Sequence, residues 1–224
     1  MERGYQMGYY SSMIVLIPAI LFAMYAQGKV ATAYRRYANV RNTSGLTGAQ
    51  VARLILDANG LSDVPINRIA GNLTDNYNPL QRTMNLSEAV YGTPSVASIS
   101  IAAHEAGHAI QHSTSYAPLK FRNAIVPVVN LGSMAAWPLL FIGLIIGSGT
   151  GDLLFNLGVI LFMGVVVFHV VTLPVELDAS RRAIAQLVSV GAVSNEQEAD
   201  AAQKVLSAAA LTYIAALAMA VANL

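Results

Sequence analysis

Four apolar stretches limit what this chain can fold into. They cover roughly residues 11–26, 125–146, 153–173 and 205–224 of the 224-residue sequence. Two of them exceed the length of about 20 residues with which an α-helix crosses the hydrocarbon core of a bilayer. Only 11% of the residues are charged, against about 25% in an average soluble domain. The sequence therefore predicts a mainly α membrane protein with four transmembrane helices.

The basic residues predict which side of the membrane each segment faces. Lys29, Arg35 and Arg36 closely follow the first stretch, which favours an uncleaved anchor over a cleaved signal peptide. With the amino terminus outside, twelve of the 13 Lys and Arg residues fall in segments 27–124 and 174–204. Because basic loops are retained in the cytoplasm, we expect both segments to face the cytoplasm of a multi-pass plasma-membrane protein.

The long segment between the first two stretches has about a hundred residues, enough for a small α+β domain. Its first clear element is a helix over Thr47–Asn59, with Thr47 as its cap and Asn59-Gly60 as its stop. The spacing of Val51, Leu54 and Ile55 predicts that these three side chains share one buried face.

The second half of this segment predicts a strand and a long helix. A turn is indicated at Asp75–Pro79, and a short strand at Thr83–Leu86. A helix then runs from about Ser95 to His112. No internal repeat or low-complexity linker is present, so residues 1–224 are interpreted as a single polytopic membrane domain.

Two histidines on the long helix carry the candidate chemistry. In His104-Glu105-Ala106-Gly107-His108, the spacing of four puts both imidazoles on one helix face, within reach of one ion. The chain has no cysteine, so His, Asp and Glu are the remaining strong ligands, and Zn2+ is the natural ion. Glu105 lies beside His104, where it could take a proton from a water at the open position of the metal.

The same spacing also arises by chance, as ordinary core or surface histidines. The residues around the pair are mostly small or apolar, including Ile101, Ala106 and Ile110, which predicts that the helix is buried on most sides. Burying two unpaired imidazoles and a carboxylate is costly. A metal would offset that cost, so the zinc interpretation is preferred.

The third ligand is sought among few remaining groups. His112 lies further around the helix than the pair, and the predicted topology puts Asp152 on the opposite side of the membrane. Two spans after the histidines, Glu176 returns to their side of the membrane at the end of the third stretch. Geometry therefore allows Glu176 as the third ligand.

Glu196 and Glu198 are the competing carboxylates. Ser194 with Gln197 three residues later has the pattern of a capping box. Acidic residues in a first helical turn also interact favourably with the helix dipole. A solvated helix start therefore explains Glu196 and Glu198 without a metal.

Other polar residues are candidates for supporting roles. Asp178 is predicted either to orient a ligand or to pair with Arg181 or Arg182. Tyr91, Arg181, Arg182 and His169 are all chemically suited to stabilise an oxyanion, and the sequence does not choose among them. For His169 we favour the simpler interpretation of a buried polar residue in the third span.

These motifs together resemble the YugP-type family of neutral, membrane-bound zinc metallopeptidases. The resemblance implies a four-helix membrane peptidase of the gluzincin kind, with Glu105 as general base and Glu176 as third ligand. The resembling stretches run from the first span to the last: Ala26–Val30, Asp75–Tyr91, His104–Gln111, Pro174–Ala183 and Lys204–Tyr213.

Two positions depart from related patterns. Asn78 stands where an acid is common in the family. More distant relatives, the CAAX-processing and heat-shock membrane proteases, carry Glu-x-x-Ala-Asp, whereas the similar sequence beginning at Glu176 ends in Ser180. The Asp that supports the metal site in those proteins is missing here.

The function expected from these residues is zinc-dependent hydrolysis of peptide bonds in a peptide or membrane-protein substrate. We expect Thr83–Leu86 to be an edge strand in a zincin-like fold, pairing with an extended substrate. The alternative is a catalytically inactive membrane scaffold or partner-regulated subunit with a structural zinc site, which would have no need of Glu105.

Further expectations concern partners. The basic residues form no long block, which excludes nucleic acid as a partner. No span carries a pair of ligands, so a zinc transporter is disfavoured. The expected partners are the lipid bilayer, the substrate, and a regulatory membrane protein or a second copy of the chain.

Overall fold

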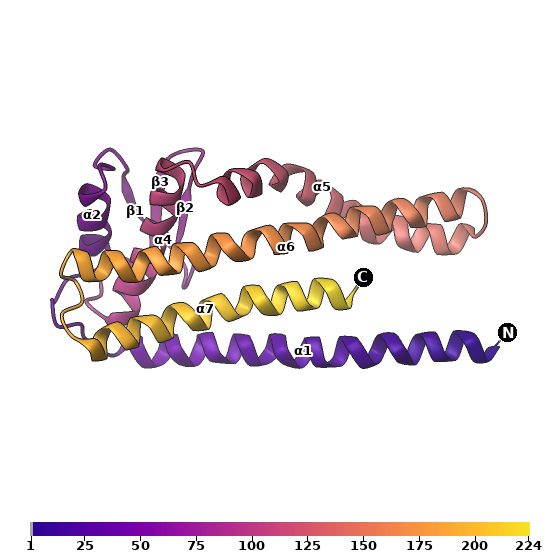
Figure 1. Ribbon diagram of the computed structural model, residues 1–224, viewed down its shortest axis with the longest axis horizontal. Coiled ribbons are helices and arrows are strands. Elements are labelled where there is room, and N and C mark those ends of the chain that lie inside the picture. Colours follow the sequence, from indigo (N-terminus) through magenta and orange to yellow (C-terminus); the bar gives the residue numbers. More distant parts are fainter. Residues whose placement is uncertain (1) are drawn as a thin grey trace. The chain divides into compact units, whose positions relative to one another are not determined.

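The computed structural model describes the backbone of residues 2–224 and the side chains of residues 14–224. Helices predominate, with one small sheet encoded between α2 and α4 (Figure 1). In chain order the elements are α1 (Glu2–Ala38), α2 (Gly48–Ala58), β1 (Ile66–Ile69), β2 (Asn76–Asn78), β3 (Thr83–Ser87), α3 (Glu88–Gly92), α4 (Val96–Ser113), α5 (Ala117–Ile146), α6 (Thr150–Ser189) and α7 (Glu196–Ala222).

The described chain forms two compact units. The first comprises the residues up to Tyr25 together with Ala117–Pro174 and Tyr213–Leu224, and the second comprises Ala26–Tyr116 and Val175–Thr212. The second unit contains the sheet, α2, α3 and α4, together with the ends of α1, α6 and α7 that do not belong to the first.

Four helices of the described chain are long and apolar enough to cross a membrane. They are α1, α5, α6 and α7, with mean hydropathies of 1.7 to 2.4 in their most apolar windows. Each includes one of the four apolar stretches, and α1, α6 and α7 continue past their stretches into the second unit. The prediction of a mainly helical chain with four membrane-length helices is confirmed.

Close packing joins α5 to α6 in the first unit. A Cβ on Gly143 would lie 2.7 Å from the Gly151 carbonyl oxygen, and one on Gly158 would lie 2.8 Å from the Leu140 side chain. Gly147, in the turn between the helices, has φ +77°. Small residues let apolar helices approach closely where lipid supplies no hydrophobic driving force.

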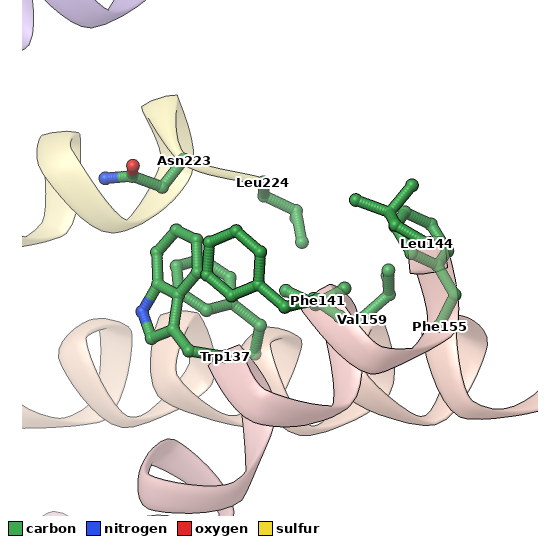
Figure 2. Close-up of a pocket in the computed structure, with 9 residues that line it drawn as sticks. Trp137, Phe141, Leu144, Phe155, Val159, Asn223 and Leu224 are labelled. Atoms are coloured by element: carbon green, nitrogen blue, oxygen red, sulfur yellow. The ribbon is translucent and has the colours of Figure 1, made fainter. Parts of the chain in front are cut away.

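A small cavity opens in the first unit (Figure 2). It has a volume of about 230 Å³ and is lined by α5, α6 and Asn223 and Leu224, which follow α7. The rings of Trp137 and Phe141 stack at its wall, with centroids 5.9 Å apart. Its lining is apolar apart from the Asn223 amide and the indole nitrogen, as expected of a surface in contact with acyl chains.

The sheet of the second unit has the order β1-β3-β2. β1 is parallel to β3, and β2 is antiparallel to it, with Tyr77 opposite Met84. The strand predicted at Thr83–Leu86 is confirmed as β3, but its predicted edge position is wrong, because β1 and β2 are the edges. The expected turn at Asp75–Pro79 is also wrong in part: Asn76–Asn78 form β2, and the turn follows it.

The core of the second unit lies between α2 and α4. Thr47 caps α2 as predicted, through a capping box with Gln50, and Asn59 ends the helix. A Cβ on Gly48 would lie 2.2 Å from the Val90 carbonyl oxygen, so only glycine allows this approach of α2. Leu54 was expected in the core with Val51 but is 42% exposed, because the buried face of α2 is turned toward Ala52 and Leu56 instead.

Glu198 corrects the prediction of a solvated helix start. Its side chain is only 6% exposed, and its two carboxylate oxygens accept hydrogen bonds from the Thr43 backbone N–H and hydroxyl, both at 2.6 Å. The cap of α7 comes from Asn195, whose side-chain oxygen accepts from the Glu198 N–H, and not from Ser194. Glu198 thereby ties α7 to the loop whose Val40 carbonyl accepts from the first N–H of α4.

We therefore expect Glu198→Ala to lower the free energy of unfolding by about 2 to 3 kcal/mol, because it removes the buried charged acceptor of two hydrogen bonds from Thr43. Glu196→Ala, at an exposed position of the same turn, should change it by less than about 0.5 kcal/mol. Thermal unfolding of both variants in detergent measures the difference. Equal stability would show that Glu198 does not hold this loop.

Candidate metal centre

The helix α4 positions two histidines and a glutamate in the second unit. Its N-cap is Ser95, whose hydroxyl accepts from the Ser98 N–H at 3.2 Å. Most of its other side chains are buried among small or apolar neighbours. His104 and His108, four residues apart, share the face that is directed at the second-unit part of α6, and their rings pack edge to face at 4.7 Å.

The backbones of α4 and α6 meet closely beside these histidines. A Cβ on Gly107 would lie 2.6 Å from the Ala179 carbonyl oxygen, so this contact requires glycine. Gly107 lowers intrinsic helix stability by about 1 kcal/mol relative to alanine. In exchange, it lets the backbones of α4 and α6 pack closely. This close packing brings Glu176, one turn before Ser180 on α6, opposite the histidine pair.

Glu176 lies between the two imidazoles. Its Oε2 is 3.2 Å from His104 Nε2 and 3.5 Å from His108 Nε2. One ligand atom from each of the three side chains lies within 4.8 Å of the others, and no other group of this kind occurs in the described chain. The residues predicted as ligands therefore do lie together, with side chains that are 4% to 14% exposed.

The remaining ring nitrogens are held by two neighbours. His108 Nδ1 is 3.0 Å from the side-chain oxygen of Gln111, which can only accept, so His108 Nδ1 carries a proton. In the neutral imidazole, Nε2 then has the lone pair that can bind a metal. His104 Nδ1 is 3.2 Å from Ser180 Oγ. When the Ser180 hydroxyl accepts this hydrogen bond, His104 also has its proton on Nδ1 and its lone pair on Nε2.

The charges of the cluster are strongly coupled. Burial acts to raise the pKa of Glu176, but the hydrogen bonds and positive charge of His104 and His108 outweigh it and hold that pKa well below its ordinary value. Burial acts to lower the pKa of His108, yet Glu176 raises it overall. Burial is the main cause of a raised pKa at Glu105, opposed by the two histidines.

These donors fit a zinc ion. At zinc–ligand distances near 2.0–2.1 Å, two corners of a tetrahedron are about 3.4 Å apart, and the Nε2–Oε2 distances of 3.2 and 3.5 Å agree with that spacing. Two neutral imidazoles and one carboxylate form a donor set typical of catalytic zinc, which leaves the fourth position open. Glu105, the neighbour of His104, is 8% exposed and stays outside this group.

The candidates for supporting roles separate in the structure. Asp178 accepts from Arg182 Nε at 2.6 Å, so it makes the predicted ion pair, and it accepts from Gln111 at 2.9 Å rather than from a ligand itself. Arg181 is 4.0 Å from Asp178, and its side chain is 79% exposed. Tyr91 lines a groove of about 740 Å³ beside α2, and His169 is half-buried in α6 against Phe168.

His112, the other competing ligand, is engaged elsewhere. Its Nδ1 is 2.8 Å from the Tyr77 hydroxyl, which reaches α4 from the edge strand β2. Asp152 caps the turn before α6 by accepting from the Gly149 N–H at 3.1 Å.

Two residues at the site have no assigned role in the sequence prediction, Gln111 and Ser180. A signal for Ser180 existed, because it stands at the position of the final Asp in Glu-x-x-Ala-Asp. Its hydroxyl contacts His104 from that position. Gln111 had no comparable signal, since two of its three contacts, to Val175 and Asp178, depend on the crossing of α4 with α6.

The fold and the cluster define a membrane protein with a His-His-Glu candidate metal centre. Consistent with this, the model of the family described as "Putative neutral zinc metallopeptidase" matches residues 12–224. The chain is 50% identical over 201 residues to "Putative membrane protease YugP" of Bacillus subtilis (strain 168), a match that covers 89% of this chain and 87% of that protein. No solved structure matches the chain. The chain belongs to this family of zinc metallopeptidases, which confirms the resemblance stated from its motifs.

Proposed function

We propose that this protein is a membrane-embedded zinc-dependent endopeptidase, with His104, His108 and Glu176 as zinc ligands and Glu105 as general base. The observation that carries the proposal is the convergence of two Nε2 atoms on one carboxylate oxygen, at 3.2 and 3.5 Å. Both histidines have oxygen partners at Nδ1, so both Nε2 atoms are available to a metal.

Zinc, when bound by these three residues, would lower the pKa of a coordinated water and polarise the substrate carbonyl. Glu105 follows His104 on α4, and its burial raises its pKa above the ordinary value for a glutamate. In this proposal the Glu105 carboxylate accepts the proton of the attacking water. It then donates that proton to the nitrogen of the leaving amine.

We assign the pairing of an extended substrate to β2. This strand is an edge of the sheet, and its Tyr77 contacts His112 on the active-site helix. An edge strand offers unpaired N–H and C=O groups to a peptide, which gives binding with little sequence selectivity. Peptide and membrane-protein substrates in an unfolded or extended form fit this assignment.

A non-catalytic scaffold with a structural zinc site is the competing function. A structural site closes the fourth position with a protein ligand, but the described chain offers three donors in this group and no fourth. A buried glutamate adjacent to the ligands is also unnecessary in a structural site. Both observations support the hydrolytic function.

The proposed orientation places the metal centre at the cytoplasmic face of the plasma membrane. The chain has no native cysteine, so Gln81→Cys, Gln197→Cys and Ser148→Cys, all at exposed positions, can each be labelled in intact cells. We expect only Ser148→Cys to react with an impermeant thiol reagent from outside. Labelling of Gln81→Cys and Gln197→Cys from opposite sides would separate α4 from Glu176.

The hydrolytic function is tested on the purified full chain in detergent. Zinc content is measured, and a panel of unfolded membrane proteins and casein is incubated with the protein, with chelator, and with chelator followed by zinc. The expected result is internal cleavage, identified from new amino termini by mass spectrometry, that chelator abolishes and zinc restores. Stoichiometric zinc with no cleavage of any panel member would favour the scaffold.

A further inference from the structure

One buried amide lies where the two ligand-bearing helices meet. Gln111, on α4, has a side chain with no exposure to solvent. Its oxygen is 3.0 Å from Nδ1 of His108. Its nitrogen donates to the carbonyl of Val175 at 2.8 Å and to Asp178 Oδ2 at 2.9 Å. A single side chain therefore contacts one ligand and the residue directly before another.

We propose that Gln111 is the positioning residue that couples His108 to Glu176, so that the two helices present their zinc ligands as one preassembled set. The inference rests on the metal centre of the proposed function and not on the hydrolytic step. Val175 immediately precedes Glu176. The hydrogen bond from Gln111 to the Val175 carbonyl therefore fixes the position of α6 along α4 next to the ligand Glu176.

The amide is matched to all three contacts. Its oxygen accepts the proton of His108 Nδ1, and its two N–H groups donate to two different acceptors, so each hydrogen-bonding group is used. A glutamate of the same size could accept from His108 but would place a second oxygen against the Val175 carbonyl and the Asp178 carboxylate. A methionine would leave all three partners without a hydrogen bond.

Val175 directly follows Pro174 in α6. Proline has no N–H, so it leaves the carbonyl of Val170, four residues earlier, without a helical donor. The Val175 carbonyl is not affected in this way, and the Gln111 hydrogen bond is an additional donor to it from α4.

Asp178 is the third hydrogen-bond partner of the Gln111 amide. Its Oδ2 accepts from the Gln111 side chain at 2.9 Å and from Arg182 Nε, one turn further along α6, at 2.6 Å. The contacts form a continuous chain from the ligand His108 to the surface.

The experiment measures zinc affinity by competition with a chromophoric chelator, using purified full-length variants and a metal-free thermal melt of each. Gln111→Glu and Gln111→Met are both expected to weaken zinc binding by about 10- to 100-fold, the usual effect of losing a support of a ligand. Ser100→Ala is the matched control. Ser100 is equally buried on α4, but its hydroxyl bonds to the Val96 carbonyl of the same helix at 2.7 Å, so its zinc affinity should be unchanged.

The outcomes separate this inference from the proposed function. Folded Gln111 variants that bind zinc as tightly as the parent would overturn the coupling role, whatever their proteolytic activity. If Gln111→Met does not fold, the isosteric Gln111→Glu decides the matter. A parent protein that binds no zinc would contradict the proposed metal centre itself. A loss of affinity as large in Ser100→Ala as in the Gln111 variants would assign the effect to general loosening of α4 and overturn the inference.

Discussion

Replacing Glu105 by Gln is expected to lower the rate of peptide hydrolysis by at least about a hundredfold while zinc stays bound. General-base catalysis typically contributes a factor of this size or more, and the amide cannot accept the proton of the attacking water. Glu105 is not part of the His104, His108 and Glu176 group, so the ligands remain intact. Initial rates on the best substrate of the panel, together with zinc content, measure both effects.

The control for this variant is Glu196→Gln, an exposed carboxylate of α7. Its rate and zinc content should equal those of the parent. A Glu105→Gln protein that cleaves at the parental rate would remove Glu105 from the mechanism. A Glu105→Gln protein without zinc would show instead that Glu105 supports the metal.

The second large effect is expected at Glu176. Glu176→Ala should lose zinc during dialysis, because it removes one of three protein ligands and leaves two imidazoles on α4 alone. Glu176→Gln, which keeps the size of the buried side chain, should also bind zinc much more weakly, since a neutral amide oxygen is a poor zinc ligand. Metal analysis after dialysis measures both variants, and a metal-free melt confirms that they are folded.

Glu196→Ala is the control for this pair and should keep its zinc. Glu198→Ala is unsuitable as a control, because the buried Glu198 carboxylate holds Thr43 and its loss should destabilise the fold. A zinc-replete Glu176→Ala protein would transfer the ligand role to another residue.

Local patterns explain which parts of the fold could be predicted. The ends of α2 and α4 depend on residues within one turn of each helix end. Both helices were therefore predicted to within a few residues. Membrane-length helices follow from long apolar stretches in the same way. The order of the strands depends on pairing between distant segments, so β3 was wrongly placed at an edge.

The same distinction holds at the metal centre. His104 and His108 share a helix face by spacing alone. Glu176 lies 68 to 72 residues from them, so its prediction needed the membrane topology and the resemblance to a family as well. The role of Glu198 was mistaken because acids at a helix start are usually solvated, and only the folded chain brings Thr43 to it. Gln111 was missed for the same physical reason.

Zinc K-edge X-ray absorption of the purified, zinc-loaded protein tests the central claim most directly. One bound zinc per chain is expected, with two imidazole nitrogens and oxygen donors at about 2.0–2.1 Å, and with the imidazole signal lost in a His104→Ala, His108→Ala double variant. A parent protein without stoichiometric zinc, or a zinc shell unchanged by loss of both histidines, would contradict the proposed metal centre.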